Sequence, residues 1–291
     1  MKVAGFTFVR NAIKYDYPIV EAITSILPIC DLLVVAVGDS EDETLQLIKN
    51  IPTEKIKIIE TVWDDSLREG GRVLAMETDK AFHAIPDDYD WAFYIQGDEV
   101  VHEDDLPIIQ KAMVENLDHQ EIDGLLFHYR HFFGSYDYVG SSLRWYPFEI
   151  RVIRNRKNIY SYRDAQGFRK DDDKRLQVAK IPAFINHYGW VKDPRTMQAK
   201  QESFNKMWHD DAWMEEYVPK VEEFDYFKNI DELKKFTGTH PKVMQPRVDR
   251  INWKFNYDLS FNRISLKQRV KQFLTKFGLH FYYTNYIIKR S

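Results

Sequence analysis

Short apolar runs alternate with helical patterns through the first hundred residues. Runs rich in β-forming residues lie at Val3–Val9, Asp31–Val37, Lys55–Thr61 and Asp90–Ile95. Between the first two runs, apolar residues recur at helical spacing from Ile19 to Leu27. Strands that alternate with helices are typical of a mainly parallel sheet with right-handed crossovers. The pattern therefore predicts an α/β fold with a Rossmann-like sheet flanked by helices.

Further helices are expected on either side of this region. Ser40–Glu43 (SEDE) has the form of a capping box that begins a helix, and Arg72–Ala84 continues the alternation with another helix. After Pro194 the run Arg195–Phe236 is rich in Trp, Met, Lys and Glu and is expected to form helices. We therefore expect a main domain over residues 1–193 and a mainly helical extension over residues 194–291.

Composition narrows the class of protein. With 291 residues, of which 44% are hydrophobic and 15% aromatic, the chain can bury a substantial core and fold by itself. A net charge of -4 argues against a nucleic-acid binder, since such proteins usually carry a basic excess. The single cysteine, Cys30, excludes an internal disulfide and is expected to fill the core in a reducing compartment. No apolar run reaches the roughly 18 residues of a spanning helix, so we expect a cytoplasmic protein.

Polar residues follow each of the four predicted strands. In open parallel sheets, ligands bind beyond the carboxyl ends of the strands. Acidic side chains gathered at one sheet edge repel each other unless a cation or donor group lies among them. The sequence therefore predicts a ligand site built from the residues after each strand, which are Arg10 and Asn11, then Asp39, Ser40 and Asp42, then Asp64 and Asp65, then Gln96, Gly97, Asp98 and Glu99.

The segment after the fourth strand, Gln96–Asp105, carries the most chemistry. Mg²⁺ and Mn²⁺ favour oxygen ligands and commonly bridge a carboxylate to substrate phosphates. Asp98 and Glu99 fit that role because they follow a strongly apolar strand and a glycine. Glu103–Asp105 are expected only to complement the dipole of the next helix.

Over residues 1 to about 205, several blocks resemble the family 2 glycosyltransferases of GT-A fold, especially bacterial members that modify envelope polysaccharides or lipid-linked glycans. The blocks are Val9–Asn11, Ser40–Thr44, Tyr94–Glu99, Glu149–Arg154, Asp164–Phe168 and His187–Trp190. Two positions depart from the family pattern. Gly38 stands where an acid is usual before Gly-Ser, with Asp39 in the place of that glycine, and Gln96 replaces the first acid of Asp-x-Asp.

The resemblance implies metal-assisted transfer of a sugar, with inversion, from a nucleoside diphosphate sugar to a hydroxyl of a glycan or lipid-linked acceptor. It implies a Mn²⁺ or Mg²⁺ ion held by Asp98, Glu99 and His187, although a histidine beside aromatics is more often structural. The donor-binding residues expected from the strand ends, the helix start and the resemblance are Arg10, Asn11, Asp39, Ser40, Asp65, Arg72, Gln96 and Asp98. An ordinary helix-start arginine is the competing account of Arg72.

Asp164 is the candidate general base for such a displacement. A carboxylate can serve when it lies within hydrogen-bond reach of the attacking hydroxyl. Arg163 and Arg169 flank Asp164 and are expected to keep it ionised at neutral pH. A surface ion pair with one of these arginines is the alternative.

The end of the chain is basic and aromatic, and such a segment can lie on anionic lipid at the inner face of the plasma membrane or simply cover the main domain. Its basic residues are Lys254, Arg263, Lys267, Arg269, Lys271, Lys276, Lys289 and Arg290.

Two other functions stay open. A sugar nucleotidyltransferase would also gather carboxylates around a metal, but it predicts a glycine-rich basic loop after the first strand, and residues 10–17 contain no glycine. A catalytically inactive glycan-binding protein is suggested by Gly38 and Gln96.

Overall fold

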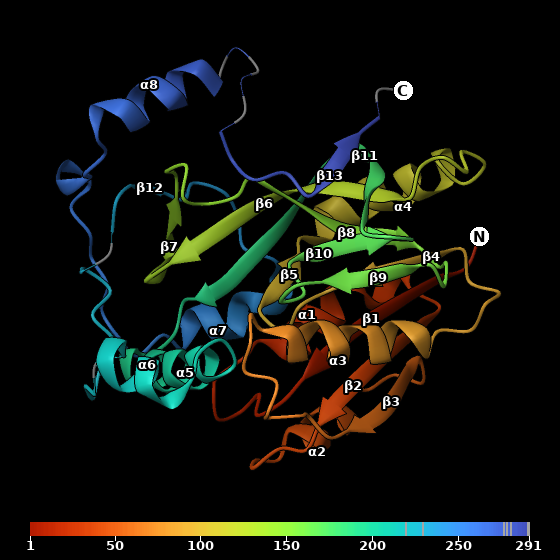
Figure 1. Ribbon diagram of the computed structural model, residues 1–291, viewed down its shortest axis with the longest axis horizontal. Coiled ribbons are helices and arrows are strands. Elements are labelled where there is room, and N and C mark those ends of the chain that lie inside the picture. The colour runs from red at the N-terminus through yellow and green to blue at the C-terminus, as the bar shows by residue number, and fades with distance from the viewer. Residues whose placement is uncertain (219, 229, 276, 278, 280, 290–291) are drawn as a thin grey trace.

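The computed structural model describes residues 1–218, 220–228, 230–275, 277, 279 and 281–289 (Figure 1). Its first half is a parallel sheet in the order β3-β2-β1-β4, with helices between the strands. This confirms the predicted α/β architecture. The strands are β1 (Val3–Val9), β2 (Leu32–Gly38), β3 (Ile56–Thr61) and β4 (Trp91–Tyr94).

The second half continues the same sheet with mixed strand directions. Strand β8 (Phe148–Arg154) runs antiparallel to β4 and to β6 (Gly124–Phe133), and β11 (Lys174–Trp190) lies parallel to β6. Short strands complete the sheet at its far side and along β6 and β11: β5 (Glu99–Val101), β7 (Ser135–Gly140), β9 (Ile159–Tyr162) and β10 (Gly167–Lys170).

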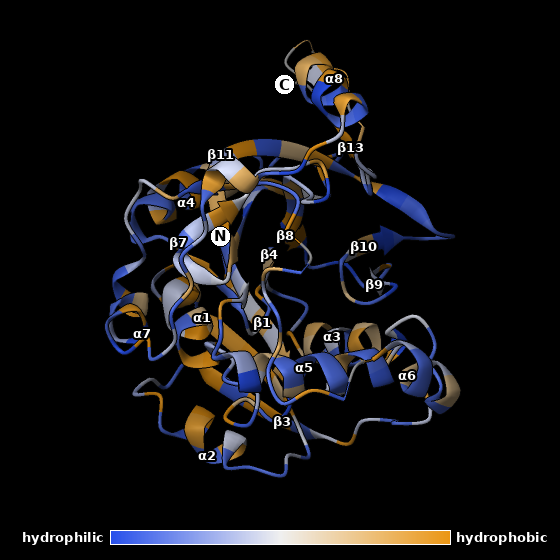
Figure 2. Cartoon of the chain, turned by 90° about the vertical axis from the view of Figure 1, so that its left-hand side faces the viewer, coloured by the Kyte–Doolittle hydropathy of each residue, from blue (hydrophilic) through white to orange (hydrophobic). Residues whose placement is uncertain are grey.

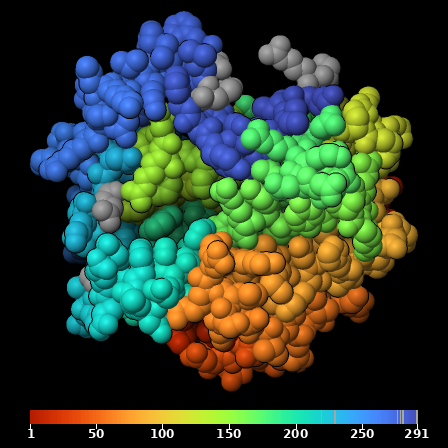
Figure 3. All heavy atoms as spheres, viewed as in Figure 1, coloured from red at the N-terminus to blue at the C-terminus, as the bar shows by residue number. Residues whose placement is uncertain are grey.

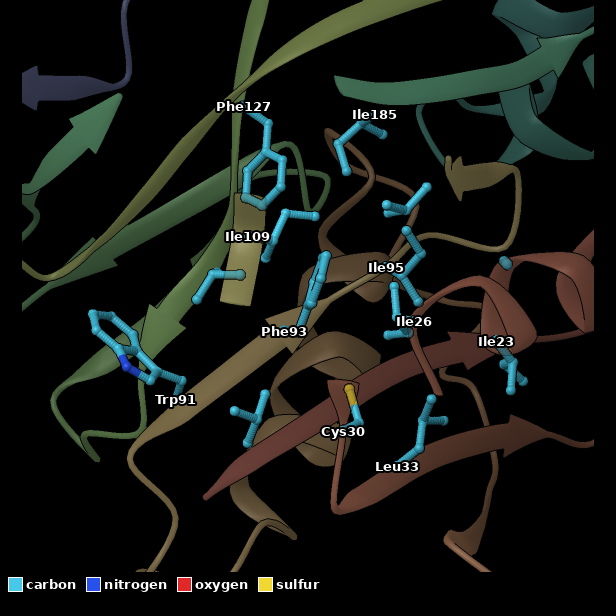
Figure 4. Packing of buried hydrophobic residues seen from close by; sticks show 14 of the residues in the cluster. Ile23, Ile26, Cys30, Leu33, Trp91, Phe93, Ile95, Ile109, Phe127 and Ile185 are labelled. Carbon is cyan, nitrogen blue, oxygen red and sulfur yellow. The ribbon is translucent and has the colours of Figure 1, made fainter. Parts of the chain in front are cut away.

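Helices cover both faces of the parallel half, which explains why its inner strands β1, β2 and β4 are mainly apolar and buried. On one face, α1 (Ile19–Ile26), α2 (Thr44–Lys49) and α4 (Leu106–Glu115) pack on alternate strand residues. On the other face lies α3 (Arg72–His83), so that Figure 2 shows apolar strands between α1 and α3. Cys30 is buried in the first of these clusters, as predicted (Figure 4). Burial raises the pKa of its thiol to about 12.

The expected capping box at Ser40–Glu43 is not formed. Helix α2 begins at Thr44, and its N-cap Glu43 makes no side-chain cap hydrogen bond. Asp42 instead accepts a hydrogen bond from the backbone N–H of Thr44 at 3.0 Å. The Ser40 hydroxyl donates to the Gly38 carbonyl at 2.8 Å, so it is engaged with the end of β2 and not with the helix.

The segment from residue 194 onward contains helices and two short strands that join the sheet. Strand β12 (Leu233–Lys235) pairs with β7, and β13 (Tyr286–Ile288) pairs with β11. The helices of this segment are α5 (Pro194–Lys206), α6 (Asp211–Tyr217), α7 (Gln245–Asp249) and α8 (Leu266–Thr275), with 3₁₀ turns at Lys242–Met244 and Leu259–Phe261. Two more 3₁₀ turns, Leu27–Ile29 and Glu103–Asp105, lie in the first half of the chain. A domain boundary at residue 194 stays a prediction.

Helix α8 projects from the body of the protein in both ribbon views (Figures 1 and 2). Among the described residues, no helix is long and apolar enough to cross a membrane. Lys276 and Arg290 of the basic tail lie outside the described residues.

Candidate active site

A cavity of about 970 Å³ opens where the carboxyl ends of the parallel strands meet helix α5 and the strands of the second half. Figure 3 shows the surface hollowed between the cyan segment around α5 and the green strands beside it. Nine predicted site residues line the cavity: Arg10, Asn11, Asp64, Asp65, Gln96, Gly97, Asp98, Asp164 and His187. The other five, Asp39, Ser40, Asp42, Arg72 and Glu99, lie outside its wall, and Arg72 is exposed at the start of α3.

The ends of the first three strands are tied together at one side of the cavity. The Arg10 guanidinium donates to Asp65 at 2.7 Å and to the Asp39 carbonyl at 3.0 Å. Asn11 has a left-handed backbone, with φ of 55°, and its side-chain oxygen accepts from the Glu41 N–H at 2.7 Å. Asp39 and Ser40 therefore support this corner through their backbone or hydroxyl groups, while Arg10 and Asn11 reach the cavity.

Glu99 is fully buried beneath the cavity and forms an ion pair with Arg151. The guanidinium Nε lies 2.8 Å from Oε2 and Nη2 lies 2.5 Å from Oε1. The Tyr129 hydroxyl and the Gln96 N–H also donate to this carboxylate. Burial alone would lower the pKa of Arg151, but the neighbouring Glu99 outweighs it and raises the pKa well above its ordinary value. Both oxygens of Glu99 are thus engaged in joining β5, β6 and β8.

Asp98 lies next to Glu99 in the chain but faces the cavity. Its Oδ2 accepts a hydrogen bond from Lys200 of α5 at 3.0 Å and lies 3.6 Å from His187 Nε2. Burial would raise the pKa of Asp98, but the positive charge of Lys200, with His187 and Lys192, lowers it well below the ordinary value. Asp98 is therefore a buried carboxylate at a strand end with a lysine ammonium directly against it.

Gly189 makes this arrangement possible. A Cβ at this position would lie 2.4 Å from His187 Nε2 and 2.6 Å from Asp98 Oδ2. Both distances are shorter than real Cβ contacts, so a side chain here would push the two groups apart. The Gly189 carbonyl also accepts from Lys200 at 2.9 Å. The glycine of the His-Tyr-Gly-Trp block thus shapes the wall around Asp98.

These residues do not fit the three-ligand metal site that the sequence predicts. The Glu99 oxygens are held by Arg151 and its neighbours, and the accessible oxygen of Asp98 is paired with Lys200. Gln96 uses its amide N–H₂ to donate to the Ala165 carbonyl at 3.1 Å. Within the part of the chain that the structure describes, no group of three or more His, Cys, Asp or Glu side chains could hold a metal ion.

Asp164 lies across the cavity on a strained loop between β9 and β10. Its neighbours Arg163 and Ala165 both have left-handed backbones, with φ of 55° and 64°. A Cβ at Gly71 would lie 2.7 Å from the Asp164 Cβ, so the loop packs closely on the start of α3. The bond from Gln96 to the Ala165 carbonyl ties this loop to the end of β4. Such strain is typical of a functional segment held by its surroundings.

The Asp164 side chain is half-buried, and its buried Oδ1 atom has no hydrogen-bond partner among the described residues. Burial raises its pKa, and Arg163 offsets this only in part. The expectation that the flanking arginines favour the ionised form is therefore met by Arg163, which lowers the pKa of Asp164, but not by Arg169. Arg163 is exposed over the Tyr162 ring, and Arg169 is turned toward Asp173 and the Asn285 carbonyl. No ion pair of Asp164 occurs within the described ranges, against the surface ion-pair alternative.

Several residues of the cavity were not foreseen from the sequence. Lys200 lies on a helix whose pattern has no motif, and its partner Asp98 is 102 residues away. His131 lines the cavity from β6, where burial lowers the pKa of its imidazole well below its usual value. Trp145 and Trp190 add two indole rings, whose centroids lie 6.4 Å apart, to the same wall. Only the closing His-Tyr-Gly-Trp block hinted at one of them.

No protein-family model and no curated protein matches the sequence. Solved structures with a similar fold include S. aureus TarS 1-349 in complex with UDP, at 13% identity over 70% of this chain and 64% of that chain, with a TM-score of 0.41. Glucosyl-3-phosphoglycerate synthase from Mycobacterium tuberculosis, in complex with Mn²⁺, UDP and phosphoglyceric acid, is 17% identical over 45% of this chain and 43% of that chain, with a TM-score of 0.30.

A third similar structure is 4-diphosphocytidyl-2C-methyl-D-erythritol synthase from Anaerococcus prevotii, at 11% identity over 70% of this chain and 94% of that chain, with a TM-score of 0.38. Against a longer TarS chain, the protein spans 39% of the length. What the cavity does is inferred below from its own residues.

Proposed function

We propose that the protein is an inverting glycosyltransferase that moves a sugar from a nucleoside diphosphate sugar to a hydroxyl group. One observation carries this proposal. The cavity joins cationic and amide groups at the parallel strand ends to a half-buried carboxylate, Asp164, one oxygen of which has no hydrogen-bond partner among the described residues. The first set suits a diphosphate, since guanidinium and ammonium groups are the usual partners of phosphate oxygens. The second suits a base that removes a proton from an acceptor hydroxyl.

In this mechanism the acceptor oxygen attacks the anomeric carbon of the donor from the side opposite the diphosphate. The bond from that carbon to the diphosphate oxygen breaks, and the electron pair leaves with the diphosphate. Asp164 takes the proton of the acceptor hydroxyl. A carboxylate whose pKa is raised by burial is a stronger base than an exposed one, and it operates closer to neutral pH. Inversion follows because the attack is a single displacement.

The cavity wall near His131 suits an acceptor that has an apolar ring face. Trp145 and Trp190 present aromatic surface there, and pockets for organic ligands are commonly built from such side chains with a few polar groups. We propose a glycan or a lipid-linked glycan as the acceptor. A divalent cation that arrives with the donor is part of the function implied by the resemblance, so the assays below include Mn²⁺.

Helix α8 supports a peripheral location at the inner face of the plasma membrane, which we propose together with the cytoplasmic setting. Leu266, Val270 and Phe273 recur at helical spacing and are each more than half exposed. Lys267 and Lys271 lie on the same helix. Basic helices with an exposed apolar stripe bind anionic lipid surfaces.

The test begins with a thermal-shift screen of nucleotide sugars, in EDTA and in Mn²⁺, because a ligand that binds the native state raises its apparent stability. Turnover and donor Kd are then measured for Asp164→Asn with the donor found. Losing a general base lowers turnover by about 10² to 10⁴ fold. Donor affinity should stay within about twofold if Asp164 acts on the acceptor.

Asp171→Asn is the matched control, because Asp171 is a carboxylate on the exposed turn between β10 and β11. It should turn over normally. Near-normal turnover of Asp164→Asn would remove Asp164 as the base. Release of pyrophosphate from a nucleoside triphosphate and a sugar phosphate would instead show a nucleotidyltransferase. Binding of glycan without any nucleotide sugar would show an inactive binding protein.

A further inference from the structure

The ammonium group of Lys200 occupies the place beside Asp98 where the sequence predicts a divalent cation. Its Nζ lies 3.0 Å from Asp98 Oδ2 and 2.9 Å from the Gly189 carbonyl oxygen. An ammonium has three N–H donors, so two are used here and one is left for a ligand. Lys200 lines the cavity, and its side chain is only 11% exposed. The protein thus holds a fixed positive charge at this point.

A second lysine, Lys192, lies near the same tyrosine ring as Lys200. Lys192 is fully buried, donates to the Asp16 carbonyl at 2.6 Å, and lies 4.8 Å from the centre of the Tyr17 ring. Lys200 lies 5.0 Å from the centre of the same ring. Burial and the nearby Lys200 charge lower the pKa of Lys192 to about 7. A divalent ion at Asp98 would add two positive charges close to Lys200 and Lys192, and these like charges would repel each other.

The residues around Asp98 also provide few free ligands for a metal ion. Gln96 offers N–H donors toward the Asp164 loop where the family pattern has a carboxylate. Glu99 is neutralised by Arg151. One carboxylate and one imidazole therefore remain, and the carboxylate is already paired with the Lys200 ammonium.

We propose that Lys200 supplies the positive charge that binds the donor diphosphate and stabilises it as the leaving group, so that donor binding needs no divalent metal ion. This rests on the proposed glycosyl transfer. When the bond from the anomeric carbon to the diphosphate oxygen breaks, negative charge develops on that oxygen, and a fixed ammonium stabilises it without reorganisation. Asp98 and the Gly189 carbonyl hold Lys200 in place, and Asp164 receives the acceptor proton.

The experiment is calorimetric titration of the full chain with inorganic pyrophosphate and with UDP, GDP, ADP and CDP, in excess EDTA and in Mn²⁺. For the wild type, the Kd of the tightest nucleoside diphosphate should agree within about twofold between the two buffers. Lys200→Met should weaken that diphosphate by about 10 to 100 fold in EDTA, as expected for a lost charged hydrogen bond. The matching nucleoside, which lacks phosphates, should bind the variant and the wild type equally.

Arg195→Met is the control for loss of a charge from the same helix. Arg195 is 66% exposed and pairs with Glu222 and Glu223 outside the cavity. It should leave every Kd unchanged. Unchanged diphosphate affinity in Lys200→Met overturns the proposal.

The titration of the wild type in EDTA and in Mn²⁺ tests the proposal without relying on a variant that must fold. Diphosphate binding that disappears in EDTA and returns with Mn²⁺ overturns the role of Lys200, and so does a failure of every diphosphate to bind in EDTA. Nucleotide sugars that bind only with Mn²⁺ would leave glycosyl transfer standing while the Lys200 proposal falls. Pyrophosphate that binds in EDTA through Lys200, with no nucleotide sugar bound in either buffer, would retain the diphosphate site and remove glycosyl transfer.

Discussion

Arg151→Met should strongly destabilise the protein because it leaves the Glu99 carboxylate buried without its partner. Glu99 is 0% exposed and Arg151 is 1% exposed, and two short hydrogen bonds join them. The remaining donors to Glu99 are the neutral Tyr129 hydroxyl and the Gln96 N–H. Neither can replace a positive charge, so the methionine variant must either bury an anion or protonate it.

The expected loss is about 3 to 5 kcal/mol of unfolding free energy, which is typical when one member of a buried ion pair is removed. Urea unfolding followed by tryptophan fluorescence measures it, provided that the slope of free energy against urea is unchanged. The double variant Glu99→Gln/Arg151→Met removes both charges and should recover a large part of the loss. Lys2→Met, which breaks an exposed pair with Asp88, should change stability little.

The outcome also bears on the role of Glu99. A loss below about 1 kcal/mol for Arg151→Met would refute the reasoning, because a buried and uncompensated carboxylate costs more than that. Full recovery of stability by Mn²⁺ in the single variant would show that Glu99 can hold a metal ion once Arg151 is gone. We expect no such recovery, since the Glu99 carboxylate is fully buried and is bound by the Tyr129 hydroxyl.

Two further predictions concern a buried acid and the projecting helix. Burial raises the pKa of Glu149 to about 8, so the folded state holds a proton between its ordinary value of 4.5 and 8 that the unfolded chain has lost. Wild-type stability should therefore fall by a few kcal/mol from pH 4.5 to 8, and Glu149→Gln should flatten this slope in urea titrations at several pH values; an unchanged slope would contradict the assignment. Liposomes with anionic lipid should bind the protein at low salt and release it at high salt. Val270→Asp/Phe273→Asp should abolish that binding, and equal flotation of variant and wild type would exclude α8 as the contact.

The sequence predicted the parallel half of the fold because the information there is local. Apolar runs such as Val3–Val9 and Asp90–Ile95 are buried on both faces, and such strands need no alternation. The parallel topology then places every strand end at one edge, which is why Arg10 and Asp98 meet in one cavity. The mixed second half was not foreseen, because β8, β6 and β11 pair across long separations that no local pattern encodes.

The charges of the site could not be assigned from the sequence for the same reason. Asp98 and Glu99 are adjacent acids, and both suit a metal by spacing alone. In the fold they face different surroundings, since Glu99 meets Arg151 across 52 residues and Asp98 meets Lys200 across 102. A local sequence motif therefore identifies the carboxylates but not the distant cationic residues that pair with them.

Two ion pairs lie after the end of β4, where the resembled family pattern has a cluster of acids that binds a metal ion. The two pairs have different surroundings. Glu99 and Arg151 are almost fully buried and join the strands at the floor of the cavity, which Arg151 helps to line, and their opposite charges cancel there. Asp98 with Lys200 lies at the cavity wall, so the carboxylate orients an ammonium whose remaining N–H is free to meet a ligand. Gln96 has a third role. Its amide donates a hydrogen bond to the Ala165 carbonyl and so holds the Asp164 loop, which an ionised carboxylate could not do. The replacement of the first acid by Gln96 therefore does not by itself indicate an inactive protein. In the proposed mechanism, Gln96 helps to position the loop of the base Asp164, and Lys200 supplies the positive charge.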